Sequence, residues 1–355
     1  MDTEESLLIL RAQYFQCLDV DCIRWPPQKL LAHPDTCYWT WKHLCFKKRA
    51  MAKLPVAQYR LVFFKRLLER LGRAGHVITD DPKEDGVLPS IVAMVEAVKK
   101  LEQMSASGSP DHPEDMHVTY TVPLFPPGSS STVNPDIVTL VESRRLVAGS
   151  RFTGHRTWDG ALHLAHYLVA EQGSTVKGRS VLELGAGAGL LSILCAKYFG
   201  AESVIATDGD ERVVEEARRN VDICGLGGEE EGQGRVEVER LWWGEDLGAS
   251  WLHDRLFKQE KSLDVVFGAD LIYNEESASA LAKTLKSLLV LKPGLKVIIS
   301  WAIRFPEVAN KFLQDCEANG LNIRDLPFTM TPYTQQKGLF YLTAVPLRII
   351  QVSSR

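Results

Sequence analysis

Short apolar runs alternate with amphipathic segments through the second half of the chain. The runs at 203–208, 235–241, 263–269 and 295–301 contain branched apolar residues and end at turn residues, which predicts strands. The segments 190–199, 211–224, 276–289 and 306–319 between or after them carry apolar residues at helical spacing. A last strand is predicted from Gly338 to Leu347. This alternation predicts a doubly wound α/β fold, with a mostly parallel sheet covered by helices on both faces.

The first hundred residues have a different pattern, which is helical throughout. Leu7, Leu10 and Tyr14 fall on one apolar face, a second helix is predicted from Pro55 to 68, and a third from 90 to 101. This part of the sequence has no recognisable pair of nucleophile and base. We therefore interpret residues 1–103 as a helical accessory domain that packs on a catalytic domain or contacts a partner.

The boundary of this accessory domain is predicted from composition. Residues 104–116 are rich in serine, glycine, proline and acidic residues, which is typical of a linker. Residues 117–122 and 137–147 then alternate like strands of a small antiparallel element. We expect a second domain over residues 117–355 that includes this β element, followed by a helix at 161–168 and the strands described above.

The sequence VLELGAGAGL at residues 181–190 predicts a buried strand, a glycine turn and the start of a helix. Glycines at 185, 187 and 189 allow a tight turn and the close approach of a ligand to the backbone, at a helix N-terminus that can face a polar group. The alternative is a tight turn without a ligand. The third glycine of a dinucleotide fingerprint is absent, because Leu190 occupies its place.

Acidic and aromatic residues follow several of the predicted strands. Asp208 ends its strand about twenty residues after the glycines, where a carboxylate can accept hydrogen bonds from ribose hydroxyls. The alternative role is the N-cap of the helix at 211–224, which Asp210 can also fill. Asp270 follows the strand at 263–269, and Trp242 and Trp243 follow the strand at 235–241, with side chains expected on opposite faces.

Composition narrows the partners of the protein. A net charge of −4 and a pI near 6.2 argue against a general nucleic-acid binder or a binder of anionic membranes. The acidic first residues and the lack of an apolar run of about 18 residues predict an intracellular, cytoplasmic protein. Seven scattered cysteines fit a reducing compartment. Four of them lie near His33 and His43 without a C-x-x-C pair, so we favour free thiols on helices over zinc and predict no metal site.

Four features together resemble the seven-strand protein-lysine methyltransferases that use S-adenosylmethionine. They are Thr157-Trp158-Asp159, LELGAGAG at 182–189, Asp208, and GADLIY at 268–273, which contains the D-x-x-Y motif of that family. The resemblance covers about residues 154–347. With the N-terminal helices included, the chain is most similar to the enzymes that methylate a lysine of eukaryotic translation elongation factor 2, and among them to the fungal members.

The resemblance implies a Rossmann-like methyltransferase fold with a seven-stranded sheet, S-adenosylmethionine as cofactor, elongation factor 2 as protein substrate, and a monomer. It implies cofactor contacts at these positions: Trp158, Gly185, Ala186, Gly187, Asp208, Trp243 and Ala269. Of the two adjacent tryptophans, we favour Trp243. Asp270 and Tyr273 of the D-x-x-Y motif, one helical turn apart at the edge of the sheet, are the candidate catalytic residues, which can hold and orient the lysine amine by hydrogen bonds. The alternative is a structural helix cap and a core tyrosine.

Methyl transfer to lysine requires a neutral amine aligned with the methyl group. Because a free lysine has a pKa near 10.4, the site must favour the neutral form by desolvation. We therefore assign Asp270 to orientation of the amine more than to its deprotonation. Trp158 or Trp243 can face the positive sulfonium.

Three rival functions remain open at this point. A nucleotide-dependent oxidoreductase needs a glycine at position 190. A methyltransferase for nucleic acid or a small molecule shares the cofactor half of the site, although base-methylating enzymes commonly have two prolines where this chain has Leu271 and Ile272. A binding protein without activity is expected to lose Asp270 or Tyr273, and both are present.

Overall fold

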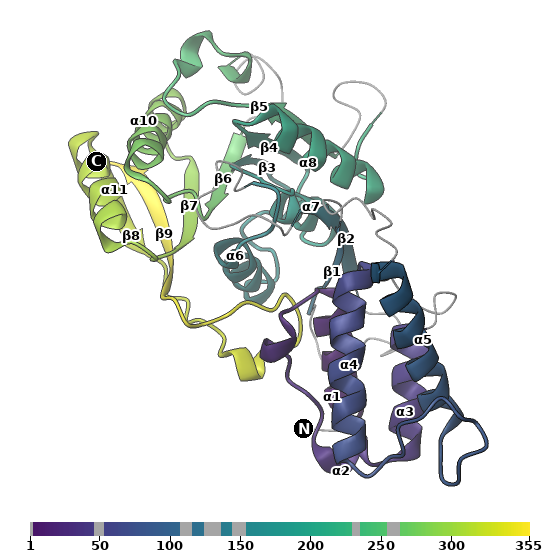
Figure 1. Ribbon diagram of the computed structural model, residues 1–355. Coiled ribbons are helices and arrows are strands. Elements are labelled where there is room, and N and C mark those ends of the chain that lie inside the picture. Colours follow the sequence, from purple (N-terminus) through teal and green to yellow (C-terminus); the bar gives the residue numbers. More distant parts are fainter. Residues whose placement is uncertain are drawn as a thin grey trace. The chain divides into compact units, whose positions relative to one another are not determined.

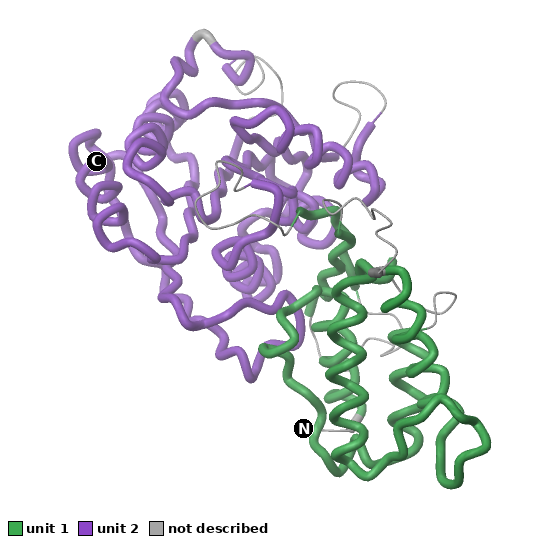
Figure 2. Tube along the Cα trace, viewed as in Figure 1, with its two compact units in different colours: residues 1–123, 130–145 green, residues 124–129, 146–355 purple. Residues whose placement is uncertain are grey.

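The computed structural model describes residues 3–45, 53–106, 116–123, 136–143, 154–228, 235–253 and 263–355. The chain divides into two compact units (Figure 2). Unit 1 comprises residues 1–123 and 130–145, and unit 2 comprises residues 124–129 and 146–355. Among the described helices, none combines the length and apolar composition needed to cross a bilayer.

Unit 1 is a helical bundle with a two-stranded sheet. Its longer helices are α1 (Thr3–Phe15), α4 (Ala57–Arg73) and α5 (Pro89–Ala106), with the short helices α2 (Gln28–Leu31) and α3 (Pro34–Thr40) between α1 and α4 (Figure 1). Tyr14 is fully buried in the core, where its ring lies 4.6 Å from that of Phe63 between centroids. The helices predicted at 55–68 and 90–101 correspond to α4 and α5, and α5 continues to Ala106.

The small β element belongs to unit 1, whereas we expected it in the methyltransferase domain. Strands β1 (Met116–Thr121) and β2 (Ile137–Glu142) pair antiparallel, as predicted, and Tyr120 donates a hydrogen bond of 2.6 Å to the buried Glu142. The physical reason is packing, because β1 contacts α1, and the Cys17 thiol lies 3.7 Å from the carbonyl oxygen of His117. Most of the predicted linker, residues 107–115, lies outside the described residues.

Unit 2 contains a seven-stranded sheet in the order β5-β4-β3-β6-β7-β9-β8. The strands are β3 (Ser180–Leu184), β4 (Ser203–Asp208), β5 (Val236–Arg240), β6 (Leu263–Ala269), β7 (Lys296–Ala302), β8 (Leu321–Asp325) and β9 (Leu347–Ser354). The first five form parallel pairs, and β9 is antiparallel to both β7 and β8. The predicted α/β class and the mostly parallel seven-stranded sheet are confirmed.

Helices cover both faces of this sheet. They are α6 (Asp159–Ala170), α7 (Leu190–Lys197), α8 (Glu211–Ile223), α10 (Glu275–Leu291) and α11 (Pro306–Ala318). Leu182 and Leu184 of β3 belong to the core that α10 and α11 cover, while Glu183 between them bonds to Ser192 of α7. This alternation along β3 places α7 on the opposite face from α10 (Figure 1).

The C-terminal part of the sheet differs from the sequence prediction. The strand expected from Gly338 to Leu347 is irregular up to residue 346, and the final strand instead runs over 347–354. Pro346 lacks the N–H that a central strand must donate, and the side chains of Phe340 and Tyr341 are buried rather than alternating. The short edge strand β8 was not predicted, because Asn322, Arg324 and Asp325 leave too little apolar pattern.

Candidate active site

The glycine loop between β3 and α7 has the backbone conformation that its glycines allow. Gly185, Gly187 and Gly189 have φ angles of 61°, 55° and 87°, in the left-handed region that residues with a Cβ rarely adopt. A Cβ at Gly187 would also stand 2.9 Å from the carbonyl oxygen of Gly154. The loop therefore needs glycine both for its turn and for the close approach of residue 154.

Glu183 lies inside the protein rather than in the loop. Its carboxylate accepts hydrogen bonds from the backbone N–H of Ser192, at 2.9 Å, and from the Ser192 hydroxyl. Burial raises the pKa of Glu183 to about 7, although the Ser192 hydrogen bonds oppose this shift. Glu183 thus ties the end of β3 to the first turns of α7 and holds the glycine loop between them.

Asp208, at the end of β4, faces the glycine loop. One carboxylate oxygen accepts the N–H of Gly187 and the other accepts the N–H of Asp210, each at 3.2 Å. Burial raises the pKa of Asp208, while the backbone donors oppose this shift. The N-cap of α8 is instead Asp210, whose side chain accepts the N–H of Arg212 at 2.9 Å. Asp210, and not Asp208, therefore caps α8.

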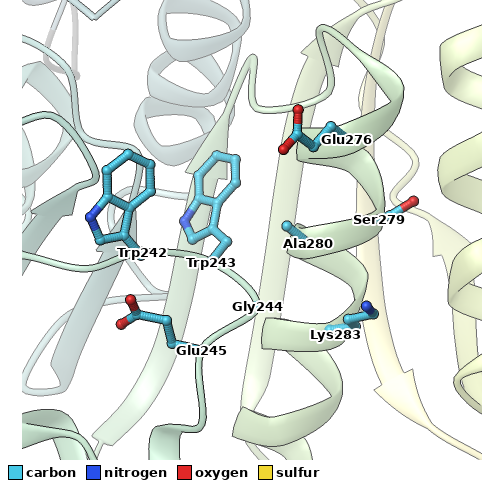
Figure 3. A pocket seen from close by; sticks show the side chains of 8 residues that line it. All are labelled: Trp242, Trp243, Gly244, Glu245, Glu276, Ser279, Ala280 and Lys283. Atoms are coloured by element: carbon cyan, nitrogen blue, oxygen red, sulfur yellow. The ribbon is translucent and has the colours of Figure 1, made fainter.

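The two adjacent tryptophans lie past the end of β5, which stops at Arg240. Figure 3 shows the two rings side by side, and their neighbours differ, because Trp243 packs against the core of unit 2 whereas Trp242 is exposed. A Cβ at Gly185 would lie 3.2 Å from Cζ2 of Trp243, so this ring borders the glycine loop. Trp242 is half exposed and borders Gly209 instead.

A pocket of about 490 Å³ lies beside these rings, between the loop after β5 and the first turns of α10 (Figure 3). Trp242 and Trp243 form one wall, and Glu276 and Ala280 of α10 lie opposite. The pocket leaves space next to the ring that we assigned to the cofactor.

Trp158 is the N-cap residue of α6. Its ring has guanidinium groups close by, because Cζ of Arg156 lies 3.9 Å and Cζ of Arg304 lies 5.2 Å from the ring centroid. Both distances are within the range of cation–π attraction. The predicted position of Trp158 at the start of a helix before the cofactor strand is confirmed.

Asp270 directly follows Ala269, the last residue of β6, and its side chain is only 5% exposed. The carboxylate accepts the backbone N–H of Gly160 at 2.8 Å and that of Ala302 at 2.7 Å, and it pairs with Arg304 at 3.2 Å. Three donors of the chain, two on Oδ1 and one on Oδ2, thus compete with a lysine amine for this carboxylate, and its role in orienting the amine stays a prediction.

Tyr273 lies in the connection before α10 rather than one helical turn after Asp270, since α10 begins only at Glu275. Asp270 has a φ of 53°, which is incompatible with a continuous helix at this point. The Tyr273 side chain is 46% exposed. Desolvation and the charge of Asp208 raise its pKa, and a hydrogen bond with Ser277 lowers it. The structure thus brings Tyr273 under the influence of Asp208.

Arg304 is a site residue that the sequence interpretation missed. It lies just past the end of β7, and it pairs with Asp270 at 3.2 Å and with Asp159 at 3.5 Å. Its position after a strand, on the same sheet edge as two acidic residues, was the available signal. No short motif includes it, because its partners are distant in the sequence.

The carboxyl edge of the sheet therefore brings together the glycine loop, Asp208, Ala269 and Trp243, and Trp158 caps the neighbouring helix. This set fits an adenosyl group. Trp243 offers an aromatic face for a purine, and the Asp208 carboxylate retains acceptor capacity for ribose hydroxyls.

Comparison with known proteins gives the family. The profile of the family described as lysine methyltransferase matches residues 148–319. The protein-lysine N-methyltransferase EFM3 of Chaetomium thermophilum is 35% identical over 308 residues, which are 86% of each chain. The protein-lysine N-methyltransferase EEF2KMT of Mus musculus is 30% identical over 62% of this chain and 64% of its own length.

Among solved structures, a SAM-dependent methyltransferase from Aquifex aeolicus is 20% identical, with a TM-score of 0.37 over 52% of this chain and 87% of that chain. The extended match to EFM3 and the lysine methyltransferase profile agree with the motifs at the sheet edge. The chain therefore belongs to the S-adenosylmethionine-dependent lysine methyltransferase family.

Proposed function

We propose that this protein transfers a methyl group from S-adenosylmethionine to a lysine side chain of translation elongation factor 2. The single observation that carries the proposal is the similarity to EFM3 over 308 residues, which extends well beyond the family range of 148–319. The name of the similar mouse protein, EEF2KMT, supports elongation factor 2 as the target. Such a target supports a cytoplasmic location for the enzyme.

The residues that would hold the cofactor are those at the sheet edge. Gly185, Ala186 and Gly187 provide the loop, and Asp208 provides an acceptor for ribose hydroxyls. Trp158, Trp243 and Ala269 complete the proposed contacts. When bound, S-adenosylmethionine supplies a methyl group activated by a positive sulfur atom. The chain contributes binding and alignment, which is the main requirement of this reaction.

Tyr273 is the residue that we assign to the lysine amine. Its phenol is partly exposed at the sheet edge, and its raised pKa keeps the hydroxyl protonated at neutral pH. A neutral hydroxyl can hydrogen-bond an amine without favouring the ammonium form, in contrast to a carboxylate. We assign Asp270 to the support of the site rather than to the amine, because three donors of the chain already contact its carboxylate, and it stays part of the proposed active centre.

The experiment is methylation with isotopically labelled S-adenosylmethionine in a cell lysate and with purified elongation factor 2. We expect label on elongation factor 2, located by mass spectrometry on a lysine Nε atom. Label on RNA, on a small molecule or on an N-terminal amine would contradict the lysine assignment. Label on a lysine of another protein would contradict only the target.

Tyr273→Phe tests the residue assignment in the same assay. We expect at least a tenfold loss of kcat with little change in the Kd of the cofactor. Tyr198→Phe is the matched control, because Tyr198 caps the far end of α7. Equal activity of Tyr273→Phe and the control would refute the role of the hydroxyl.

A further inference from the structure

The guanidinium of Arg304, just past the end of β7, contacts three groups at the start of α6 and the end of β6. Nη1 lies 3.2 Å from Oδ1 of Asp270, and Nη2 lies 3.5 Å from Oδ2 of Asp159. Cζ lies 5.2 Å from the ring centroid of Trp158. The planar guanidinium can pair with two carboxylates and pack on a ring face at the same time, which a lysine ammonium cannot do.

Asp270 makes the second half of the same connection. Oδ2 accepts the N–H of Gly160, the second residue of α6, and Oδ1 accepts the N–H of Ala302, the last residue of β7. A carboxylate at a helix N-terminus is favoured by the helix dipole and by the unpaired N–H groups there. Asp270 therefore fastens the first turn of α6 to the end of β7.

The position of Asp270 is tightly constrained by its surroundings. A Cβ at Gly160 would stand 2.8 Å from Cγ of Asp270, so the carboxyl group lies directly against the helix backbone. The backbone N–H of Asp270 donates to the carbonyl of Ser300 in β7 at 2.8 Å. Backbone and side chain of this residue are thus both anchored within the protein.

From this arrangement we propose that Asp270 and Arg304 are positioning residues, which hold the Trp158 ring in the place where it contacts the cofactor. They hold the first turn of α6, and with it the ring at its N-cap, against the ends of β6 and β7. The proposal rests on the proposed function in one respect, the assignment of Trp158 to the cofactor. It differs from a direct contact of Asp270 with the lysine substrate, and it gives Arg304 a role in the reaction.

The experiment measures the Kd of S-adenosylmethionine by calorimetry, without any protein substrate, for Arg304→Met, Arg304→Lys and Asp270→Asn. We expect Arg304→Met and Asp270→Asn to raise the Kd at least tenfold, and Arg304→Lys to recover part of the loss. In a Trp158→Ala background, Arg304→Met should raise the Kd less than twofold further, because the ring that it positions is gone.

Arg348→Met is the matched control. The Arg348 side chain is also 32% exposed, pairs with an aspartate, Asp325, and has Cζ 5.6 Å from the Trp301 ring centroid. We expect it to leave the Kd within twofold of the unsubstituted protein. An equal effect of Arg348→Met and Arg304→Met would overturn the proposal, because the loss would then be general.

Kinetic measurements separate the two roles of Asp270. We expect the KM for the protein substrate to stay within threefold in Arg304→Met and Asp270→Asn. A tenfold higher KM with an unchanged cofactor Kd would overturn the proposal in favour of substrate contact. If Asp270→Asn does not fold, the Arg304 series and the Trp158→Ala background decide alone.

Failure of the proposed function has a different signature. An unsubstituted protein that binds S-adenosylmethionine but labels no lysine contradicts only the proposed substrate, and the Kd series still decides on the positioning role. An unsubstituted protein that does not bind S-adenosylmethionine overturns both proposals.

Discussion

Gly185 lies against the indole of Trp243, so that a Cβ at this glycine would stand 3.2 Å from Cζ2 of the ring. The same Cβ would meet Cδ2 of Leu271 at 2.5 Å, a distance that requires a shift of the neighbour. Gly185 is therefore needed both for the turn of the loop and for the close packing of the Trp243 ring against it.

Gly185→Ala should destabilise the protein and weaken cofactor binding together. The left-handed φ of 61° costs an alanine about 1–2 kcal/mol, and crowding against Leu271 adds about 1–3 kcal/mol. Gly178→Ala is the control, because Gly178 has a φ of 66° and open space around it in the described part of the chain. Urea unfolding measures the stability and calorimetry the cofactor Kd. Equal values of both for the two variants would contradict this prediction.

Asp208→Asn should raise the Kd of S-adenosylmethionine about tenfold or more. The substitution removes the charge and half of the acceptor capacity of the group that faces the glycine loop at Gly187. Asp210→Asn, two residues away, keeps an effective N-cap for α8 and should bind the cofactor like the unsubstituted protein. Calorimetry that shows the same Kd for both variants would remove Asp208 from the site.

Glu183→Gln should change how stability depends on pH. A carboxyl group with a pKa raised from 4.5 to about 7 binds its proton more tightly in the folded state. The free energy of unfolding therefore falls as pH rises between about 4.5 and 7, by about 2–4 kcal/mol for this group. The difference between the unfolding curves of the two proteins should show this slope, and parallel curves from pH 5 to 8 would contradict it.

Glu216→Gln should destabilise the protein more at low pH than at high pH. His155 pairs with Glu216 at 2.5 Å, and this hydrogen bond raises the pKa of His155. A raised histidine pKa gives stability that is fully present below about pH 6.5 and is lost as pH rises through the folded value. We expect a loss of about 1–2 kcal/mol at pH 6 and less at pH 9.

Glu215→Gln is the control for this pair. Glu215 is exposed on the same helix, so its substitution should change the free energy of unfolding little at either pH. Thermal or urea unfolding at the two pH values is the measurement. A pH-independent loss in Glu216→Gln would show that the pair acts by packing rather than by charge.

The parts of the site that are local in sequence were predictable. The glycine loop follows from one ten-residue pattern, and Asp208 follows from its place at the end of a strand. The partners of Asp270 were not predictable in this way, because Gly160 lies 110 residues away and Ala302 lies 32 residues away. A motif identified Asp270 as important, but only the fold shows that its carboxylate faces backbone donors.

Strands of the sheet also differ in how well the residue pattern predicts them. Apolar strands such as β4 and β6 were predicted within a few residues, because both faces of each strand are covered. The edge strand β8 has a polar face and escaped detection. The different neighbours of Trp242 and Trp243, Gly209 and Gly185, are distant in the sequence, so the residue pattern does not reveal them.

The place of β9 in the sheet has a consequence for biosynthesis. Residues 347–354 insert between β7 and β8, although both of those strands are made earlier. Until these residues leave the ribosome, β7 exposes an apolar strand edge and β8 has no neighbour in the sheet. Such an edge can pair with a strand of another chain. We therefore expect a chain truncated before residue 347 to recruit chaperones, whereas the chain that contains β9 can close the sheet and lose this interaction.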